Sequence, residues 1–429
     1  MQIIENLKVK EKLYIEKLEN GLTIMIIPKH ETLKKYIMWA TNYGSLDNKF
    51  IAPGDKEVTN VPEGVAHYLE HKMFEQKNGK NSLDTLTMLG VDANAYTTTN
   101  YTTYLFECTD NFYPALDELM DYVQNPYFTD ENVEKEKGII SQEIMMYDDY
   151  PEWVVYMNAI RCMYLNHPIK IDIAGTVESI KQIDKDILYK CYNTFYNLNN
   201  MVMCVVGDFE PQNLLEEIKK RIIKKENNNV KVQRITEEEP KQIVKKSTEK
   251  NMEVSQNLFV IGIKDINFNK TQNEEELIKK HIAIEILLNM LIGKSSKTYK
   301  NLYEKGLIMS EPYLEYEFEK TYAHVVITGM SDNPQKVLKI LQEEIEKLKK
   351  NGLEEKHFKR IKNMIYGDYI KEYNNVSNIA RMFISDYFKG INSFNYLEYF
   401  NEVSIEYTQK VLEDVFKEEY TVISVVKKK

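Results

Sequence analysis

The stretch VAHYLEHKMFEQ, residues 65–76, decides how the rest of the chain is interpreted. It follows Pro62, a residue favoured in the first turn of helices, and we expect it to be helical. His67 and His71 are then one turn apart and share a face. Glu70, between them in sequence, places a carboxylate beside the same face. The spacing therefore predicts two imidazoles and an acid gathered at one point.

Imidazole nitrogens at positions i and i+4 of a helix can bind one zinc ion. A catalytic zinc usually has three protein ligands and a water, so a further carboxylate is expected from a neighbouring element. Glu70 could then take a proton from the attacking water and pass it to the leaving amine. The alternative is a solvated helix face that carries two histidines by chance. Only seven histidines occur in 429 residues, which disfavours chance but leaves both interpretations open.

Length and composition narrow the class of protein. A chain of 429 residues exceeds one ordinary core, so two domains are expected. The formal net charge of −10 disfavours a general nucleic-acid binder. We see no signal peptide and no apolar run of roughly 18 to 20 residues. The four cysteines are widely spaced without a CxxC pair, which favours reduced thiols in a cytoplasmic protein.

The order of predicted elements indicates an α+β fold. Residues 101–123 and 321–345 share one pattern, an apolar strand, a polar Asp-Asn turn and an amphipathic helix. We therefore expect two related domains, each an antiparallel sheet with helices packed on one face. Residues 225–254 are charged and nearly free of apolar periodicity, which indicates a linker with room for one strand, or alternatively a long surface loop. The expected domains are a catalytic unit at 1–224 and a metal-free unit at 255–429.

The segment 67–71 is also the inverted zinc signature His-x-x-Glu-His of the inverzincins. Nearly the whole chain resembles the pitrilysin/insulinase family, especially its small bacterial members and the mitochondrial processing peptidase subunits. Segments spread over the first half carry this resemblance: Gly44-Ser45 with Asp47, Gly64, Phe74, Asn94-Ala95-Tyr96-Thr97 with Tyr104, residues 134–151, His167-Pro168 with Gly175, and Val206-Gly207-Asp208. Together they are more specific than the five-residue motif.

The resemblance implies a zinc metalloendopeptidase that works as half or all of a clam-shell chamber. Glu143, 72 residues after His71, would be the third zinc ligand, with one zinc per chain. Glu136 would be a catalytic-site carboxylate that orients a ligand, although a solvated helix-face charge is its alternative. Asn94, Ala95 and Tyr96 would bind substrate along an edge strand. The alternative is that they belong to an ordinary internal strand without a ligand. The implied substrates are peptides or unfolded polypeptides, including a small precursor peptide; a non-catalytic scaffold or regulatory subunit is the alternative function.

The second half departs from the family. After Gly293-Lys294-Ser295-Ser296, Tyr303 stands where the family has a substrate-contacting Arg, and Met309 or Ser310 where it has a Tyr. Two candidates could replace that pair within the chain, Arg381 and Tyr387, although both could equally be packing residues. Otherwise a second chain supplies it, and we expect a dimer with a zinc-free paralogous subunit rather than a homodimer. No nucleic-acid partner and no membrane span are expected.

The remaining histidines of the second half are expected to be structural or solvent-facing. They are His281, His324 and His357. Gly293-Lys294-Ser295 is not a phosphate-binding loop, because Leu288 occupies the position of the required first glycine.

Overall fold

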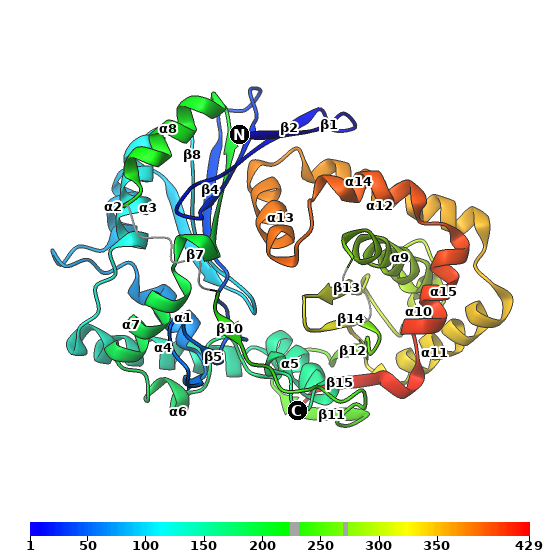
Figure 1. Cartoon of the computed structure of the whole chain (residues 1–429). Coiled ribbons are helices and arrows are strands. Elements are labelled where there is room, and N and C mark those ends of the chain that lie inside the picture. Colours follow the sequence, from blue (N-terminus) through cyan, green and yellow to red (C-terminus); the bar gives the residue numbers. More distant parts are fainter. Residues whose placement is uncertain (224–230, 269–272) are drawn as a thin grey trace. The chain divides into compact units, whose positions relative to one another are not determined.

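The structure is a computed structural model that describes residues 1–223, 231–268 and 273–429 (Figure 1). The chain forms two compact units. Unit 1 comprises Met1–Ile144, Ile171–Thr236 and Lys371–Ser393, and unit 2 comprises Met145–Lys170, Glu237–Ile370 and Phe394–Lys429. Each combines a sheet with helices, so the expected α+β class is confirmed.

Unit 1 is built on a sheet with the strand order β1-β2-β3-β9-β4-β8-β7, in which only β3 and β9 run parallel among the described pairs. A second, small sheet has the strand order β10-β5-β6. The strands are β1 (Gln2–Asn6), β2 (Glu11–Lys17), β3 (Thr23–Pro28), β4 (Lys35–Thr41), β5 (Lys49–Ile51), β6 (Thr59–Asn60), β7 (Asp92–Thr97), β8 (Thr102–Cys108), β9 (Met201–Gly207) and β10 (Gln233–Arg234). The helices are α1 (Val65–Lys72), α2 (Ser82–Met88), α3 (Phe112–Gln124), α4 (Asp130–Asp148, which runs into unit 2), α6 (Val177–Ile180), α7 (Lys185–Phe195), α8 (Pro211–Arg221) and α13 (Val376–Lys389).

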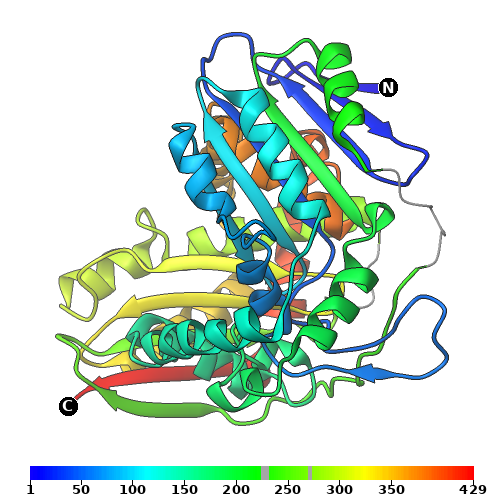
Figure 2. The ribbon, with the colours of Figure 1, turned by 90° about the vertical axis from the view of Figure 1, so that its left-hand side faces the viewer.

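The central strands of this sheet are buried on both faces. Every residue of β9 is buried, as an uninterrupted apolar strand requires. Helices α3 and α8 pack on one face, against β8 and β3, and α13 packs against β4 and β9. Figure 2 shows α3 and α8 in front of the sheet and α13, in orange, behind it. Helices therefore cover both faces of this sheet, where the sequence led us to expect one.

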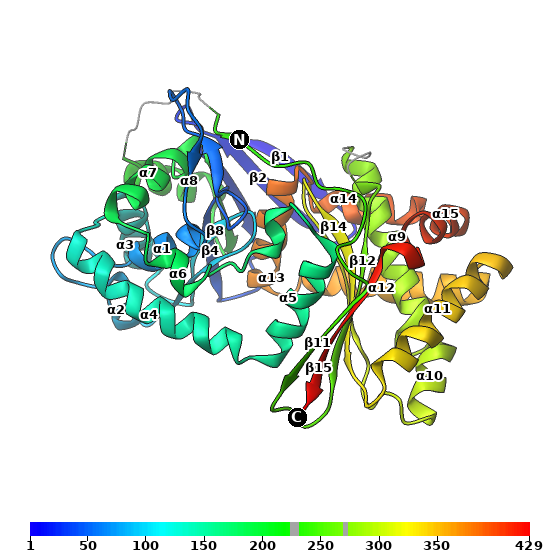
Figure 3. The ribbon, with the colours of Figure 1, turned by 90° about the horizontal axis from the view of Figure 1, so that it is seen from below.

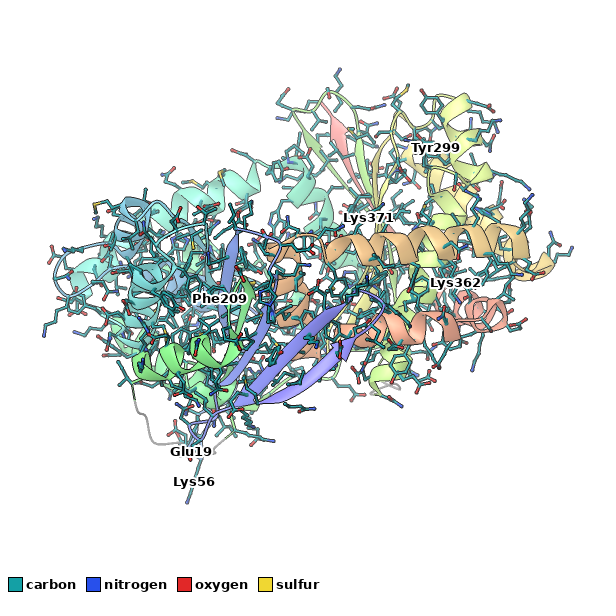
Figure 4. All side chains as sticks on the ribbon, turned by 90° about the horizontal axis from the view of Figure 1, so that it is seen from above. Glu19, Lys56, Phe209, Tyr299, Lys362 and Lys371 are labelled. Carbon is teal, nitrogen blue, oxygen red and sulfur yellow. The ribbon has the colours of Figure 1, made fainter. Side chains whose placement is uncertain are left out.

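Two aromatic side chains pack against each other just after the end of β9. Phe209, labelled in Figure 4, follows β9 and packs against Phe112 at the start of α3, with ring centroids 4.6 Å apart. Both rings are buried in the core that surrounds α1 and α4. The helices that carry the candidate site therefore rest on a fixed hydrophobic layer.

Unit 2 has a sheet with the order β11-β15-β12-β14-β13. Figure 3 shows its strands, with β11 and β15 parallel to each other. The strands are β11 (Ser247–Met252), β12 (Leu258–Lys264), β13 (Tyr313–Phe318), β14 (Ala323–Met330) and β15 (Thr421–Lys428). The helices are α5 (Pro151–Met163), α9 (Glu274–Ile292), α10 (Lys297–Glu304), α11 (Pro334–Asn351), α12 (Glu355–Glu372, ending in unit 1), α14 (Phe394–Tyr399) and α15 (Ile405–Val415).

Each half of the sequence contributes one helix to the compact unit that is formed mainly by the other half. Helix α5 comes from the first half but packs on β11, β12 and β15 of unit 2. A Cβ added to Gly262 on β12 would lie 2.9 Å from Met163 Sδ, so the glycine allows α5 to approach the strand closely. Helix α13 makes the reverse exchange into unit 1. A contiguous division at 1–224 and 255–429 therefore does not describe the compact units, because amphipathicity does not tell which sheet a helix covers.

The expected linker 225–254 contributes strands to both units. Its residues 225–230 lie outside the described part of the chain. Of the rest, β10 pairs with β5 in unit 1 and β11 pairs with β15 in unit 2. The described part of the segment thus contains two short strands rather than one. The expected repeat appears as β8 followed by α3 and β14 followed by α11.

Candidate metal centre

Helix α1 is held in place by a glycine directly before it and a tyrosine within it. Gly64 has a left-handed backbone (φ 88°), and a Cβ there would meet the Ala174 carbonyl oxygen at 2.4 Å. The loop at 174–175 can therefore press against the start of the helix. The buried Tyr68 hydroxyl donates a hydrogen bond to the carbonyl of Val133 on α4. This bond ties α1 to α4, so their facing side chains are fixed relative to each other.

Two histidines of α1 and one glutamate of α4 converge on a point. Glu143 Oε1 lies 3.6 Å from His67 Nε2, and Glu143 Oε2 lies 3.4 Å from His71 Nε2. The three potential ligand atoms all lie within 4.8 Å of one another. Both distances are too long for good hydrogen bonds. They are close to the edge of about 3.3 Å expected between ligands of a tetrahedral zinc ion with bonds of about 2.0 Å.

The donor set also fits zinc chemically. Two imidazoles and one carboxylate are the ligands of a catalytic zinc site that keeps a position open. His67, together with a contribution from His71, holds the pKa of the Glu143 carboxyl below its ordinary value although burial raises it. A carboxylate kept ionised in this way is ready to bind a cation. Among the described residues, only these three form a group of this kind.

Glu136, on α4, contacts the ring nitrogen of His71 that does not face Glu143. Its Oε1 is 3.1 Å from His71 Nδ1, and its Oε2 accepts a bond from Lys72 Nζ at 3.3 Å. Burial raises the pKa of Glu136, but the His71 hydrogen bond and the Lys72 charge outweigh it and leave the pKa lowered. The arrangement fixes the His71 ring with Nε2 toward Glu143.

Sequence reasoning missed Lys72. Its side chain is completely buried, and Nζ also pairs with Glu75 Oε1 at 2.9 Å. The signal available was a lysine inside an apolar helical stretch, with a glutamate three residues later. That pattern is equally typical of an exposed surface pair, so burial could not be anticipated.

Glu70 lies beside the three converging groups, and Thr97 orients it. The Thr97 hydroxyl donates a 2.6 Å hydrogen bond to Glu70 Oε2. Glu70 is 6% exposed, and burial raises its pKa, with His67 and the Thr97 bond opposing the rise in part. A carboxylate with a raised pKa and a fixed position suits proton transfer. Sequence reasoning placed Thr97 in the expected substrate-binding edge strand but did not connect it with Glu70.

The predicted substrate residues lie on β7, the last strand in the sheet order. Among the described residues β7 pairs only with β8. Asn94 is exposed, and its side-chain oxygen accepts a bond from the Ala95 backbone nitrogen. The Tyr96 ring lies under Arg381 of α13, with 5.2 Å between the guanidinium carbon and the ring centroid. Tyr387 of the same helix shares a 2.9 Å hydrogen bond with Thr23 of β3.

The other second-half residues singled out from the sequence, Tyr303 and the three histidines, lie in unit 2. Tyr303 is 53% exposed and stacks on Tyr299 at 6.0 Å. His281 Nδ1 is hydrogen-bonded to the Tyr396 hydroxyl at 2.8 Å, and the buried His324 Nδ1 lies 3.1 Å from the Tyr164 hydroxyl. Burial lowers the pKa of the third histidine, His357.

Two further findings concern the cysteines and the apolar character of the helices. The four cysteines, all among the described residues, are buried and unpaired. No described helix is both long enough and apolar enough to cross a membrane.

The chain is similar to known peptidase sequences and structures over nearly its whole length. Residues 54–177 match the family described as Insulinase (Peptidase family M16), and residues 182–365 match the Peptidase M16 inactive domain. A Bacillus subtilis protein named as an uncharacterized zinc protease, YmfH, is 37% identical over 433 residues, covering 99% of both chains. A probable mitochondrial-processing peptidase subunit beta of Arabidopsis thaliana is 25% identical over 195 residues, covering 44% of this chain and 37% of its own.

Solved structures are also similar to this chain over nearly its whole length. A putative M16-like peptidase from Alicyclobacillus acidocaldarius superposes with a TM-score of 0.93 at 30% identity, covering 99% of this chain and 100% of the other. A Helicobacter pylori protease shares the fold, with a TM-score of 0.82 at 20% identity, covering 97% and 99% of the two chains. The similarity in sequence over the full length, together with the inverted motif at 67–71, shows that the chain belongs to the M16 (insulinase) family of zinc peptidases.

Proposed function

We propose that the chain is a zinc-dependent endopeptidase that hydrolyses peptides and unfolded polypeptides. His67, His71 and Glu143 bind one zinc ion, and Glu70 is the general base. The observation that carries the proposal is the convergence of both Nε2 atoms on the Glu143 carboxylate, with Glu70 alongside.

Each residue of the site has a distinct task. A bound zinc ion supplies Lewis acidity toward the scissile carbonyl and lowers the pKa of water. Glu70 accepts the proton of the attacking water and later delivers it to the leaving amine. The Thr97 hydroxyl holds the Glu70 carboxylate in one orientation. Glu136 holds the His71 ring and keeps its Nε2 directed at the metal position.

The substrate adds to the free edge of β7 as an extra strand. Within the segment Asn94–Tyr96, the main-chain groups that do not pair with β8 would hydrogen-bond the peptide and hold many sequences with little selectivity. The support is that β7 ends the sheet order and that its last residue, Thr97, contacts Glu70. A peptide on this edge would pass next to the proposed base. Maturation of a small precursor peptide is one activity this arrangement could perform.

The alternative is a non-catalytic scaffold or regulatory subunit of a heterodimer. The family match described as an inactive domain covers residues 182–365, a range that does not include His67, Glu70, His71 or Glu143. All four chemical groups are present and close together, which favours the enzyme. Partnership with a zinc-free paralogous chain and a cytoplasmic location remain predictions. Native mass spectrometry with peptidase assays tests the predicted partnership. Full activity of the lone chain would show that no partner is required.

Peptide hydrolysis by the purified chain tests the proposal. We expect an internally quenched fluorescent peptide to be cleaved, cleavage to stop with a zinc chelator, and zinc to restore it. An unfolded protein such as reduced, alkylated casein should be degraded while a folded domain of similar size survives. Glu70→Gln should abolish turnover and keep the bound zinc. Turnover by Glu70→Gln at the wild-type rate would disprove the assigned base, and a lack of cleavage both alone and with a paralogous subunit would favour the scaffold.

A further inference from the structure

The two faces of β7 have different surroundings. Thr97 points to the face of α1, because its hydroxyl contacts Glu70. Ala95 and Ala93, two and four residues before it, pack against the core on that same side. Tyr96 therefore points to the opposite face, together with Asn94. A peptide paired with this edge would likewise present alternate side chains to the two faces.

Helix α13 brings a cation to the face opposite Glu70. Figure 1 shows this helix, in orange, beside β4 of the same unit. Arg381 lies in its first half, is exposed, and stacks over the Tyr96 ring at 5.2 Å. Within the described ranges, Arg381 forms no ion pair with a carboxylate. An exposed guanidinium beside an aromatic ring is a ready binding partner for an anion.

Neighbouring groups do not neutralise this charge. Glu107, on β8 and on the same face, is already paired with Lys34 at 2.6 Å. Asp92 lies at the far end of β7, opposite Glu107. Burial raises the pKa of Tyr36 to about 12, and burial also raises the pKa of Tyr96, so both phenols stay protonated at neutral pH. Arg381 is therefore a cation that no carboxylate pairs with among the described residues, in a chain whose formal net charge is −10.

We propose that Arg381 is a specificity-determining residue that selects an Asp or Glu side chain in the substrate strand; this rests on the proposed peptidase function. The selected side chain lies on the Tyr96 face of the bound peptide. Because Tyr96 immediately precedes Thr97, that position is within about two residues of the scissile bond. The carboxylate meets the guanidinium as a charge-assisted pair over the tyrosine ring. Peptides with lysine at this position place two cations together and bind less well.

A position scan with matched peptides tests the proposal. Each position of one quenched fluorescent peptide is substituted in turn by Glu and by Lys, and kcat/KM is measured for wild type, Arg381→Gln and Arg381→Glu. We expect one position near the cleaved bond where wild type prefers Glu over Lys by about twofold to fivefold, as for an exposed ion pair. Arg381→Gln should remove this preference and Arg381→Glu should reverse it. Lys389→Gln, the same charge change at the other end of α13, should keep it.

A binding assay separates this proposal from the proposed function. The Glu and Lys peptides are titrated against Glu70→Gln protein, with and without Arg381→Gln, by fluorescence anisotropy. A Glu preference in binding that depends on Arg381 supports the inference even if no cleavage occurs, in which case only the catalytic function fails. A Glu-to-Lys ratio that is the same with arginine and with glutamine at 381, in cleavage and in binding, overturns the inference. Circular dichroism of each variant checks that α13 remains folded.

Discussion

Replacing the buried Lys72 by methionine should destabilise unit 1. The change keeps the volume and removes a charge that lies 3.3 Å from Glu136 and 2.9 Å from Glu75. Lys72 is fully buried and the Glu136 side chain is 9% exposed, so this pair resembles a buried ion pair, whereas Glu75, at 30%, can rehydrate. Breaking a buried pair leaves a charge without compensation and costs about 3 to 5 kcal/mol. We expect about 3 kcal/mol, because His71 still contacts Glu136.

The assay uses the chain's two tryptophans. Trp39 is buried on β4 in unit 1 and Trp153 belongs to unit 2, so a Trp153→Phe background lets fluorescence follow unit 1 alone. Urea unfolding of chelator-treated protein gives the free energy of unfolding for Lys72→Met, Glu136→Gln and the double variant. The double variant should be less destabilised than the sum, with a coupling of about 1.5 to 3 kcal/mol. A coupling below about 0.5 kcal/mol would refute the electrostatic role given to the lysine.

Three further perturbations test other contacts. Thr97→Val removes the hydrogen bond to Glu70, so kcat should fall by about tenfold at unchanged zinc content; unchanged steady-state kinetics would show that the bond does not orient the base. Burial raises the pKa of Glu317, but the charge of His324 and hydrogen bonds from His324, Tyr156 and Tyr322 outweigh it and lower the pKa from 4.5 to about 2. Ionised Glu317 therefore contributes up to about 3 kcal/mol of stability above pH 4.5, a contribution lost as the pH falls toward 2. Glu317→Gln should therefore destabilise unit 2 at pH 7 and much less near pH 3, and a pH-independent difference in unfolding free energy would contradict this. Tyr68→Phe loses the hydrogen bond to Val133 and should cost about 1 kcal/mol in urea unfolding; a neutral effect would mean that α1 does not depend on this bond.

The local part of the site could be predicted from sequence because a helix fixes which residues share a face. His67, Glu70 and His71 lie within five residues, and helical periodicity alone gathers them. Glu143 lies on a helix rich in acids, 72 residues after His71. Only the family resemblance distinguished it, because no local pattern encodes which of several carboxylates meets a distant histidine.

The supporting contacts were beyond sequence reasoning. Lys72 and Thr97 are unremarkable in the sequence, and their roles arise from burial and from the pairing of β7 beside α1. The helix exchange of α5 and α13 was also missed. Both are amphipathic or apolar helices, and such a pattern shows that a face is buried but not which sheet buries it. The position of Arg381 beside Tyr96 follows from that exchange.

Zinc content of purified variants tests the central claim most directly. Inductively coupled plasma mass spectrometry of wild type and Glu70→Gln should give about one zinc per chain, as expected for a single site with three protein ligands. Glu143→Ala, with circular dichroism showing a folded chain, should lose most of that zinc, because it removes the carboxylate that faces both His67 and His71. Full zinc occupancy in folded Glu143→Ala, or a wild-type chain that binds no zinc, would contradict the proposed metal centre.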